Sequence, residues 1–297
     1  MQKFRGLGVA MVTPFSADGS IDIPALEKLT NFLIEGGVDY LVVQGTTGES
    51  PVLSKEEKQT TLDVVAKTNN GRKPIVFGIG GNNTASVLND LKTFKLENVD
   101  AILSASPYYN KPTQEGIYQH YKMLAEGTDL PIILYNVPGR TASNMSPDTT
   151  IKLANDFDNI IAVKEASGSM EQIMEIIQNK PKDFLVISGD DAITLPILSA
   201  GGDGVISVVG NGYPHAFGKM VDSCLTGDFE IGRKYHYEIL PIINPLFSEG
   251  NPAGIKESLA DQGIIESHVR LPLVSVSQAL KDKIIALGRN INKAFPY

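Results

Sequence analysis

Residues 160–165 read Ile-Ile-Ala-Val-Lys-Glu, an unbroken apolar run that ends in two charged side chains. A strand with one face in water alternates apolar and polar residues, whereas a strand of a parallel sheet is covered on both faces and reads as a continuous apolar run. Leu41-Val42-Val43 has the same character. We therefore expect a parallel sheet with both faces buried and with helical crossover connections between its strands.

Short apolar or β-branched runs of this kind recur along the chain, and each is followed by a segment with the spacing of an amphipathic helix. The helix signals include a capping box at Ser54–Glu57 and the pair Ser146-Pro147, where proline occupies the first helical position. Eight β-α units favour a (β/α)8 TIM barrel over an open doubly wound sheet, which usually has fewer strands and a glycine-rich first turn. The runs lie at 8–13, 40–44, 74–78, 101–104, 131–136, 160–164, 184–189 and 204–208.

The barrel is expected to close near residue 225. Residues 1–227 would then form the catalytic barrel domain, and residues 228–297 a C-terminal helical region. Proline interrupts helices because it lacks a backbone N–H and its ring clashes with the preceding turn. The helices of the C-terminal region are therefore predicted to be broken at Pro241, Pro245, Pro252 and Pro272.

The composition excludes several classes of function. The chain of 297 residues is 42% hydrophobic, enough for a sizeable core, and 26 Lys and Arg against 34 Asp and Glu give a net charge of −8. Nucleic acids and anionic membranes attract positive potential, so neither is expected as a partner. A single cysteine, Cys224, excludes an internal disulfide framework, and no window approaches the roughly 18 apolar residues of a membrane span. Residues 1–6 do not lead into an apolar signal region, so we expect a cytoplasmic protein.

Lys164 is the first candidate for chemistry. In a (β/α)8 barrel the reactive groups lie at the carboxyl ends of the strands, and Lys164 ends the run at 160–164. A buried ammonium must either pair with a carboxylate, with Glu165 or Glu49 as candidates, or lose its proton and act as a nucleophile that forms a Schiff base. Spacing alone leaves both interpretations open. Tyr135 ends the neighbouring run and is either a core residue or a phenol that transfers protons.

Other strand ends supply groups that bind anions. Gly45-Thr46-Thr47-Gly48 offers two hydroxyls and several backbone N–H groups to a carboxylate, although a plain turn fits equally well. Arg140 is either a carboxylate anchor or an exposed surface residue. We interpret Asp190-Asp191 as a cap of the following helix rather than as a metal site. We interpret Lys256 as a salt-bridged helix residue rather than as a residue that binds a ligand. The histidines lack the spacing or the cysteine partners of a zinc site: His120, His215, His236 and His268.

Together these strand ends resemble the dihydrodipicolinate synthase family, within the pyruvate-dependent lysine-aldolase superfamily. The superfamily motif Gly-x-x-Gly-Glu is matched by residues 45–49, its lysine by Lys164-Glu165-Ala166 and its tyrosine by Tyr135-Asn136-Val137-Pro138. The resemblance implies that Lys164 forms an iminium with the keto group of pyruvate and that loss of a methyl proton gives an enamine. The enamine would attack aspartate semialdehyde, whose amine would then displace Lys164 and close the ring of 4-hydroxy-tetrahydrodipicolinate, in lysine and diaminopimelate biosynthesis.

By the same resemblance, a hydroxyl relay moves the protons, and one of its members, Tyr109, reaches in from a neighbouring subunit of a homotetramer built as a dimer of dimers. Two carboxylates are held by side chains, that of pyruvate by Thr47 and that of the semialdehyde by Arg140. No metal and no organic cofactor is implied. The remaining assignments are Tyr135 and Thr46 as the other members of the relay, and Gly189 and the Ile206 backbone as walls of the pocket.

The nearest alternative within the superfamily is an N-acetylneuraminate lyase, which shares the lysine, the tyrosine and the Gly-x-x-Gly-Glu turn. Arg140, within Val137-Pro138-Gly139-Arg140-Thr141, suits a short acidic aldehyde and favours the synthase. A second alternative is a protein that keeps the barrel and only binds a carboxylate, without catalysis. A phosphosugar isomerase would need a phosphate site after the last two strands, and that region is made acidic by Asp190, Asp191 and Asp203.

The resemblance also bears on regulation. Feedback inhibition by lysine in regulated members of the family uses two histidines and an acid near the dimer cleft. Lys55, Lys58 and Ser86 stand at the matching positions here, with Asn82 and Tyr108 retained. Because two cations repel a cationic ligand, we expect inhibition by lysine to be weak or absent.

Overall fold

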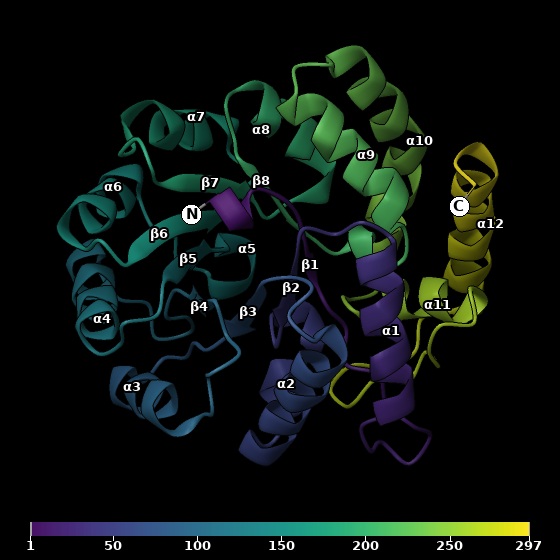
Figure 1. The fold of residues 1–297 in the computed structure, drawn as a ribbon, viewed down its shortest axis with the longest axis horizontal. Coiled ribbons are helices and arrows are strands. Elements are labelled where there is room, and N and C mark those ends of the chain that lie inside the picture. The colour runs from purple at the N-terminus through teal and green to yellow at the C-terminus, as the bar shows by residue number, and fades with distance from the viewer. Residues whose placement is uncertain (1, 297) are drawn as a thin grey trace.

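Eight parallel strands pair in sequence order and close on themselves in the computed structural model, which describes residues 2–296 (Figure 1). The barrel is completed by β1, which pairs with both β2 and β8. The predicted (β/α)8 fold is confirmed. The strands are β1 Gly6–Ala10, β2 Tyr40–Val43, β3 Ile75–Gly78, β4 Ala101–Ala105, β5 Ile132–Asn136, β6 Ile160–Glu165, β7 Leu185–Ser188 and β8 Gly204–Ser207.

The first strand begins earlier than the run predicted at 8–13. Gly6 already pairs with Gly204 of β8, and the strand ends at Ala10. Thr13, which the prediction placed in the strand, instead donates from Oγ1 to the carbonyl of Gly48 at 2.7 Å. Glycine at both Gly6 and Gly204 lets the two backbones approach closely, since a Cβ on Gly204 would lie 2.3 Å from the Gly6 carbonyl oxygen.

Side chains of each strand alternate between the inside of the barrel and the surrounding helices. The inward side chains form one apolar cluster, which includes Val42, Val76, Ile133 and Ile187. The outward side chains pack with the helices in a second, larger cluster. Strand β6 is therefore buried along its whole length. This double burial is the reason that residues 160–163 show no polar alternation.

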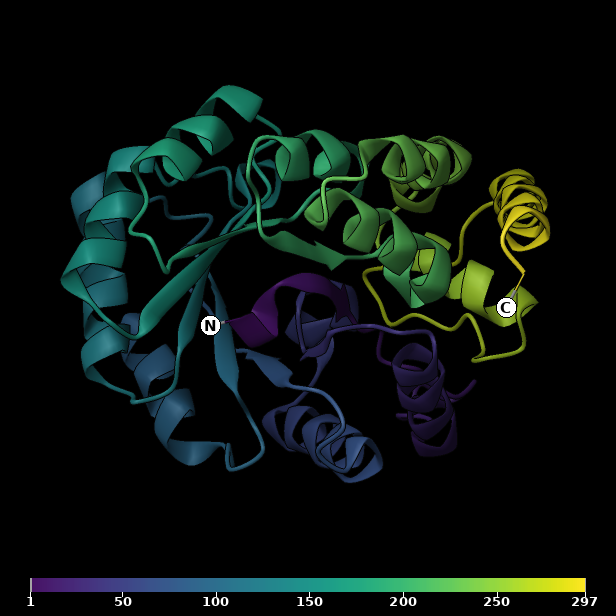
Figure 2. The ribbon, with the colours of Figure 1, turned by 45° about the horizontal axis from the view of Figure 1, so that its top comes forward.

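The helices form a ring outside the strands (Figure 2). Their sequence signals are confirmed: Ser54 and Glu57 form the capping box of α2, with the Glu57 N–H donating to Ser54 Oγ at 3.2 Å and the Ser54 N–H donating to Glu57 Oε2 at 2.9 Å. Pro147 is the first residue of α6. The ring consists of α1 Ile23–Glu35, α2 Lys55–Asn69, α3 Thr84–Thr93, α4 Gln114–Glu126, α6 Pro147–Asp156, α7 Met170–Asn179, α8 Thr194–Ser199 and α9 Pro214–Leu225.

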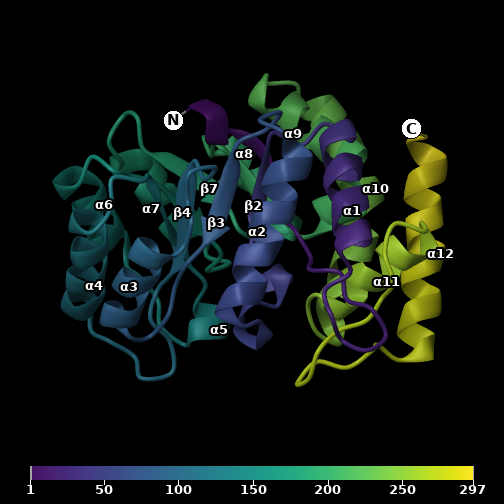
Figure 3. The same cartoon turned by 60° about the horizontal axis from the view of Figure 1, so that its bottom comes forward.

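The two ends of the barrel differ. A 3₁₀ turn, η1 Gln2–Phe4, covers the end where the strands begin, and the Phe4 ring packs edge-on to Tyr40 with centroids 5.7 Å apart. The short helix α5 Pro138–Thr141 follows the carboxyl end of β5. Figure 3 shows the N-terminus and α5 at opposite ends of the molecule. The carboxyl ends of the strands, which carry the candidate catalytic side chains, therefore lie at the α5 end of the barrel, opposite η1.

The C-terminal region adds α10 Phe229–Ser248, α11 Ala253–Asp261 and α12 Gln278–Ala294 beside α1 and α9 (Figure 1, Figure 3). The predicted helix breaks at Pro241 and Pro245 are wrong, because both prolines lie inside α10. An interior proline costs roughly 3 kcal/mol. Full burial of Ile239, Ile242 and Ile243 offsets this cost, since each such side chain contributes about 1.5–3 kcal/mol.

The other two prolines lie outside helices, with Pro252 at the start of α11 and Pro272 in the segment before α12. The boundary predicted between residues 227 and 228 falls in the turn between α9 and α10. That these are separate domains stays a prediction. Across residues 2–296, no helix combines the length and the hydropathy needed to cross a membrane.

Candidate active site

Lys164 and Tyr135 lie side by side on neighbouring strands, and both face the inside of the barrel. They pair in register across β6 and β5, near the carboxyl ends of these strands. Lys164 is 5% exposed and Tyr135 is 6% exposed. The Nζ of Lys164 lies 4.3 Å from the centroid of the Tyr135 ring, over the electron-rich face. An amine and a phenol thus share one end of the barrel.

The ion pair considered for Lys164 is wrong. The Glu165 side chain points toward the helices, and burial raises the pKa of its carboxyl. Glu49 is held by Lys256. Among residues 2–296, no carboxylate lies within the 4.0 Å limit of an ion pair with Lys164. The carboxylate of Glu165 instead accepts hydrogen bonds from Asn136, Ser167 and Gln172.

The turn after β2 forms a short 3₁₀ helix, η2 Thr46–Gly48. Thr47 is buried, and its Oγ1 accepts a hydrogen bond from Asn251 Nδ2 at 3.0 Å. A hydroxyl that already accepts one hydrogen bond still has its own proton to donate, which is what a bound carboxylate requires. The geometry therefore agrees with a carboxylate site at this turn.

A cavity of about 280 Å³ opens at the carboxyl ends of β2, β3, β4 and β5. Thr46, Tyr135 and Arg140 lie on its wall, so that η2, β5 and α5 converge on one space. Lys164 contacts this wall through the ring of Tyr135. The volume is at the small end of the range for ligand pockets and suits a small organic acid.

Helix α5 carries Arg140 at the rim of this cavity. The backbone N–H of Arg140 donates to the carbonyl of Val137 at 2.9 Å, which closes the turn directly after β5. The side chain is exposed, and within the described part of the chain it forms no ion pair. An unpaired guanidinium on a cavity wall can bind a carboxylate through two parallel hydrogen bonds.

Gly189 and Ile206 belong to the two β-α units that follow Lys164. Gly189 follows β7, and a Cβ built on it would lie 2.7 Å from the Cβ of Ala166 and 3.1 Å from the Cε of Lys164. Glycine therefore leaves the space that the lysine side chain occupies. Ile206 is 1% exposed and belongs to the inward cluster that also contains Tyr135.

Tyr109 points outward from the chain. It is 90% exposed and adopts a left-handed backbone with φ +64°, which few residues other than glycine do. Its neighbour Tyr108 lies on the cavity wall instead. Since Tyr109 is almost entirely in solvent, its ring is free to contact another protein molecule.

Residues 3–290 match the family model described as the Dihydrodipicolinate synthetase family. The chain belongs to this family. It is 54% identical over 293 residues to a 4-hydroxy-tetrahydrodipicolinate synthase of Flavobacterium psychrophilum, which covers 99% of this chain and 100% of that one.

Two solved structures of the family have nearly the same fold. A crystal structure of dihydrodipicolinate synthase has a TM-score of 0.92 and 43% identity, and covers 98% of this chain and 99% of its own. A structure described as the first monomeric dihydrodipicolinate synthase variant has a TM-score of 0.93 and 40% identity, and covers 98% and 96%. Full-length similarity of this extent makes the barrel and the C-terminal helices together the unit shared within the dihydrodipicolinate synthetase family.

The roles of two residues near the site were not predicted from the sequence. Asn251 comes from the C-terminal region, and no motif connects it with Thr47. Asp191 was interpreted as a cap of its own helix, but only Asp190 has that role, accepting from the Ala192 N–H at 3.0 Å. Asp191 is buried, which raises its pKa, and it fixes the loop after β8 by accepting hydrogen bonds from the backbone N–H groups of Val208 and Val209.

Proposed function

We propose that this protein condenses pyruvate with L-aspartate 4-semialdehyde to give 4-hydroxy-tetrahydrodipicolinate, a lyase reaction of lysine and diaminopimelate biosynthesis. The observation that carries the proposal is the buried Lys164 amine, which has no carboxylate partner among residues 2–296 and lies against the ring of Tyr135 beside a small cavity. Relatives at about half identity over the full chain are named for this activity. A lysine in this setting is the group that Schiff-base chemistry requires.

The reaction begins when the Lys164 nitrogen attacks the keto carbon of pyruvate. A carbon–nitrogen bond forms, the keto oxygen leaves as water, and an iminium results. Loss of a methyl proton gives the enamine, whose carbon attacks the aldehyde carbon of the second substrate while the aldehyde oxygen takes up a proton. The amine of that substrate then displaces Lys164, which closes the ring and frees the enzyme. Covalent attachment thus divides one difficult carbon–carbon bond formation into easier steps.

The surrounding side chains have distinct roles in this proposal. Tyr135 and Thr46 relay the protons, which agrees with their place on the cavity wall. Thr47 binds the carboxylate of pyruvate with the proton that its hydrogen bond from Asn251 leaves free. Arg140 binds the carboxylate of the semialdehyde at the rim. Gly189 leaves room for the Lys164 side chain, and the Ile206 backbone shapes the pocket.

The proposal includes a homotetramer in which Tyr109 completes the relay of a neighbouring subunit. Its 90% exposure and its left-handed backbone support this role, because a tyrosine ring held outward in solvent is available to a neighbouring subunit. A test mixes two inactive variants, Lys164→Ala and Tyr109→Phe. If Tyr109 acts across the interface, mixed assemblies contain some sites with both residues intact and recover activity. If subunit exchange is verified and activity does not recover, the shared site is ruled out.

The direct test of the reaction is reduction with borohydride in the presence of pyruvate, followed by peptide mass mapping. We expect a pyruvate adduct on Lys164 and none in Lys164→Ala. A product assay then compares pyruvate plus aspartate semialdehyde with pyruvate plus N-acetylmannosamine. We expect turnover with the first pair of substrates and none with the second. If Lys164→Ala still binds pyruvate, and neither the wild-type protein nor this variant shows turnover, the protein is a binding protein instead. We place the protein in the cytoplasm, since its single buried cysteine needs no oxidising compartment.

A further inference from the structure

A fully buried ion pair joins the C-terminal region to the turn that carries Thr46 and Thr47. Lys256, on α11, places its Nζ 2.6 Å from Glu49 Oε1, and the two side chains are 0% and 1% exposed. The same Nζ donates to the carbonyl of His268 at 2.7 Å and lies 4.3 Å from the centroid of the Phe15 ring. The sequence prediction of a salt-bridged helix residue at Lys256 is confirmed.

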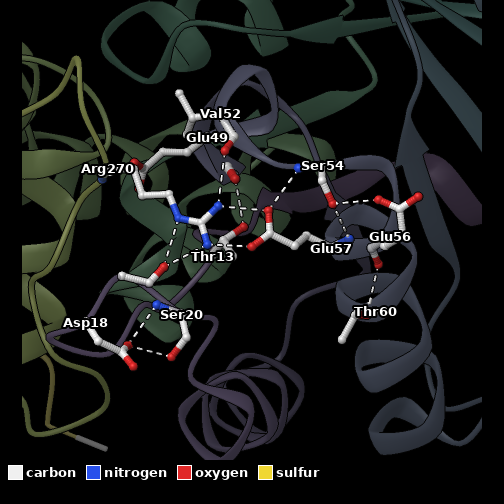
Figure 4. Close-up of polar contacts among 12 residues, drawn as sticks. Thr13, Asp18, Ser20, Glu49, Val52, Ser54, Glu56, Glu57, Thr60 and Arg270 are labelled. Carbon is white, nitrogen blue, oxygen red and sulfur yellow. Dashed lines mark hydrogen bonds and ion pairs between the residues drawn. The ribbon is translucent and has the colours of Figure 1, made fainter.

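Arg270 reinforces this junction from the segment between α11 and α12 (Figure 4). Its backbone N–H donates to Glu49 Oε2 at 3.0 Å, so both carboxylate oxygens of Glu49 are bound from the C-terminal region. Its guanidinium donates to the carboxylate of Glu57, to the Val52 carbonyl at 3.1 Å and to the Gly19 carbonyl at 2.7 Å. This pairing lowers the pKa of Glu57 to about 2.

The bonds of Glu49 act on the turn directly in front of it. Glu49 has a left-handed backbone with φ +56°, and its N–H donates to the carbonyl of Thr46 at 3.2 Å. Asn251 holds the Thr47 hydroxyl from the same C-terminal region. A non-glycine residue keeps a left-handed backbone only where its surroundings hold it there. The carboxylate of Glu49, bound at both oxygens, is the part of the residue that can provide this hold.

We propose that Lys256 and Glu49 are positioning residues for pyruvate: their buried pair fixes the η2 turn so that the Thr47 hydroxyl meets the substrate carboxylate and the Thr46 hydroxyl stays in reach of the relay. This inference rests on the function proposed above. It gives the C-terminal region a part in the reaction, beside the hydrogen bond that Asn251 donates to Thr47. Burial lowers the pKa of Lys256 to about 8, and the negative charge of Glu49 opposes that shift, as expected for a charge that is kept buried only by its partner.

The test replaces the pair in two steps. Lys256→Met keeps most of the aliphatic side chain but leaves the buried Glu49 charge without its cationic partner, which is severely destabilising in general. The double variant Lys256→Met with Glu49→Gln removes both charges and is the one expected to fold. We expect the double variant to lose about 10- to 100-fold in kcat/KM for pyruvate and in the rate of the borohydride-trapped adduct, because a displacement of about 1 Å costs up to roughly 10²-fold. The KM for aspartate semialdehyde should change less than about twofold.

Lys281→Met is the matched control. It breaks the ion pair at 2.9 Å between Lys281 on α12 and Glu257, the residue next to Lys256 on α11. This variant should lose some thermal stability and keep the wild-type KM for pyruvate. A double variant that folds and keeps wild-type kcat/KM for pyruvate, or loses affinity for both substrates equally, overturns the positioning role. If wild-type enzyme itself forms no adduct with pyruvate, the proposed function fails, and the positioning role fails with it.

Discussion

Replacing Gly189 by alanine would press directly on the Lys164 side chain. The added Cβ would lie 2.7 Å from the Cβ of Ala166, 3.1 Å from the Cε of Lys164 and 3.2 Å from the carbonyl oxygen of Glu165. Carbon atoms in contact prefer about 3.5–4.0 Å, so the approach to the Cβ of Ala166 is roughly 1 Å too short, and the approach to the Cε of Lys164 is too short by a few tenths of an ångström. The backbone cannot retreat easily, because the Gly189 N–H donates to the same Glu165 carbonyl at 2.8 Å. The lysine side chain is the part that can move.

The expected cost divides between stability and reactivity. Overpacking by a methyl group in a filled core destabilises a protein by about 1–3 kcal/mol. A reacting group displaced by about 1 Å loses up to roughly 10²-fold in rate, and a displacement of a few tenths of an ångström costs less. We therefore expect Gly189→Ala to fold with a lower melting temperature and to form the pyruvate adduct on Lys164 about 3- to 10-fold more slowly. Melting curves and a borohydride quench time course measure the two effects.

Gly202→Ala separates crowding from contact with the lysine. A Cβ on Gly202 would lie 2.6 Å from the Cγ2 of Ile197 and 2.9 Å from its carbonyl oxygen, near the beginning of β8 and the opposite end of the barrel. This variant should lose comparable stability and keep the wild-type adduct rate. The reasoning is refuted if Gly189→Ala, with its melting temperature lowered, forms the adduct as fast as Gly202→Ala.

Three further outcomes are expected. Tyr135→Phe keeps the ring under the Lys164 amine and removes only the hydroxyl, so turnover should fall by about 10²–10⁴ with folding intact; near-normal turnover in a steady-state assay would exclude Tyr135 from the relay. Burial lowers the pKa of His120 from 6.5 to about 4. His120 therefore binds a proton in the unfolded chain more readily than in the folded chain, and its contribution to the free energy of unfolding falls by about 3 kcal/mol from pH 7 to pH 4. In urea titrations, the free energy of unfolding of His120→Gln should fall less steeply over this range; an identical pH dependence would contradict this. Lysine should inhibit weakly or not at all, because Lys55 and Lys58 repel it; sub-millimolar inhibition of turnover would contradict this.

Much of the fold and part of the site were predictable from local sequence. Apolar runs without polar alternation identify the buried parallel strands, because the requirement for double burial acts on each strand separately. The capping box of Ser54 and the proline at the start of α6 depend only on neighbours within one helical turn. The place of Lys164 and Tyr135 at the ends of consecutive strands follows from their position within each run.

Contacts between distant segments were beyond the reach of local pattern. Pro241 and Pro245 remain inside α10, because tertiary burial outweighs their local cost. The ion-pair interpretation of Lys164 failed because the alternation of a strand sends Lys164 inward and Glu165 outward, and because Glu49 takes its partner from a residue 207 positions along the chain. Local pattern is enough to identify the buried strands and the strand ends that carry chemistry, because burial on both faces acts within each strand. Which charges neutralise one another depends on the folded chain, since a Coulomb interaction depends on distance in space and not on separation along the chain.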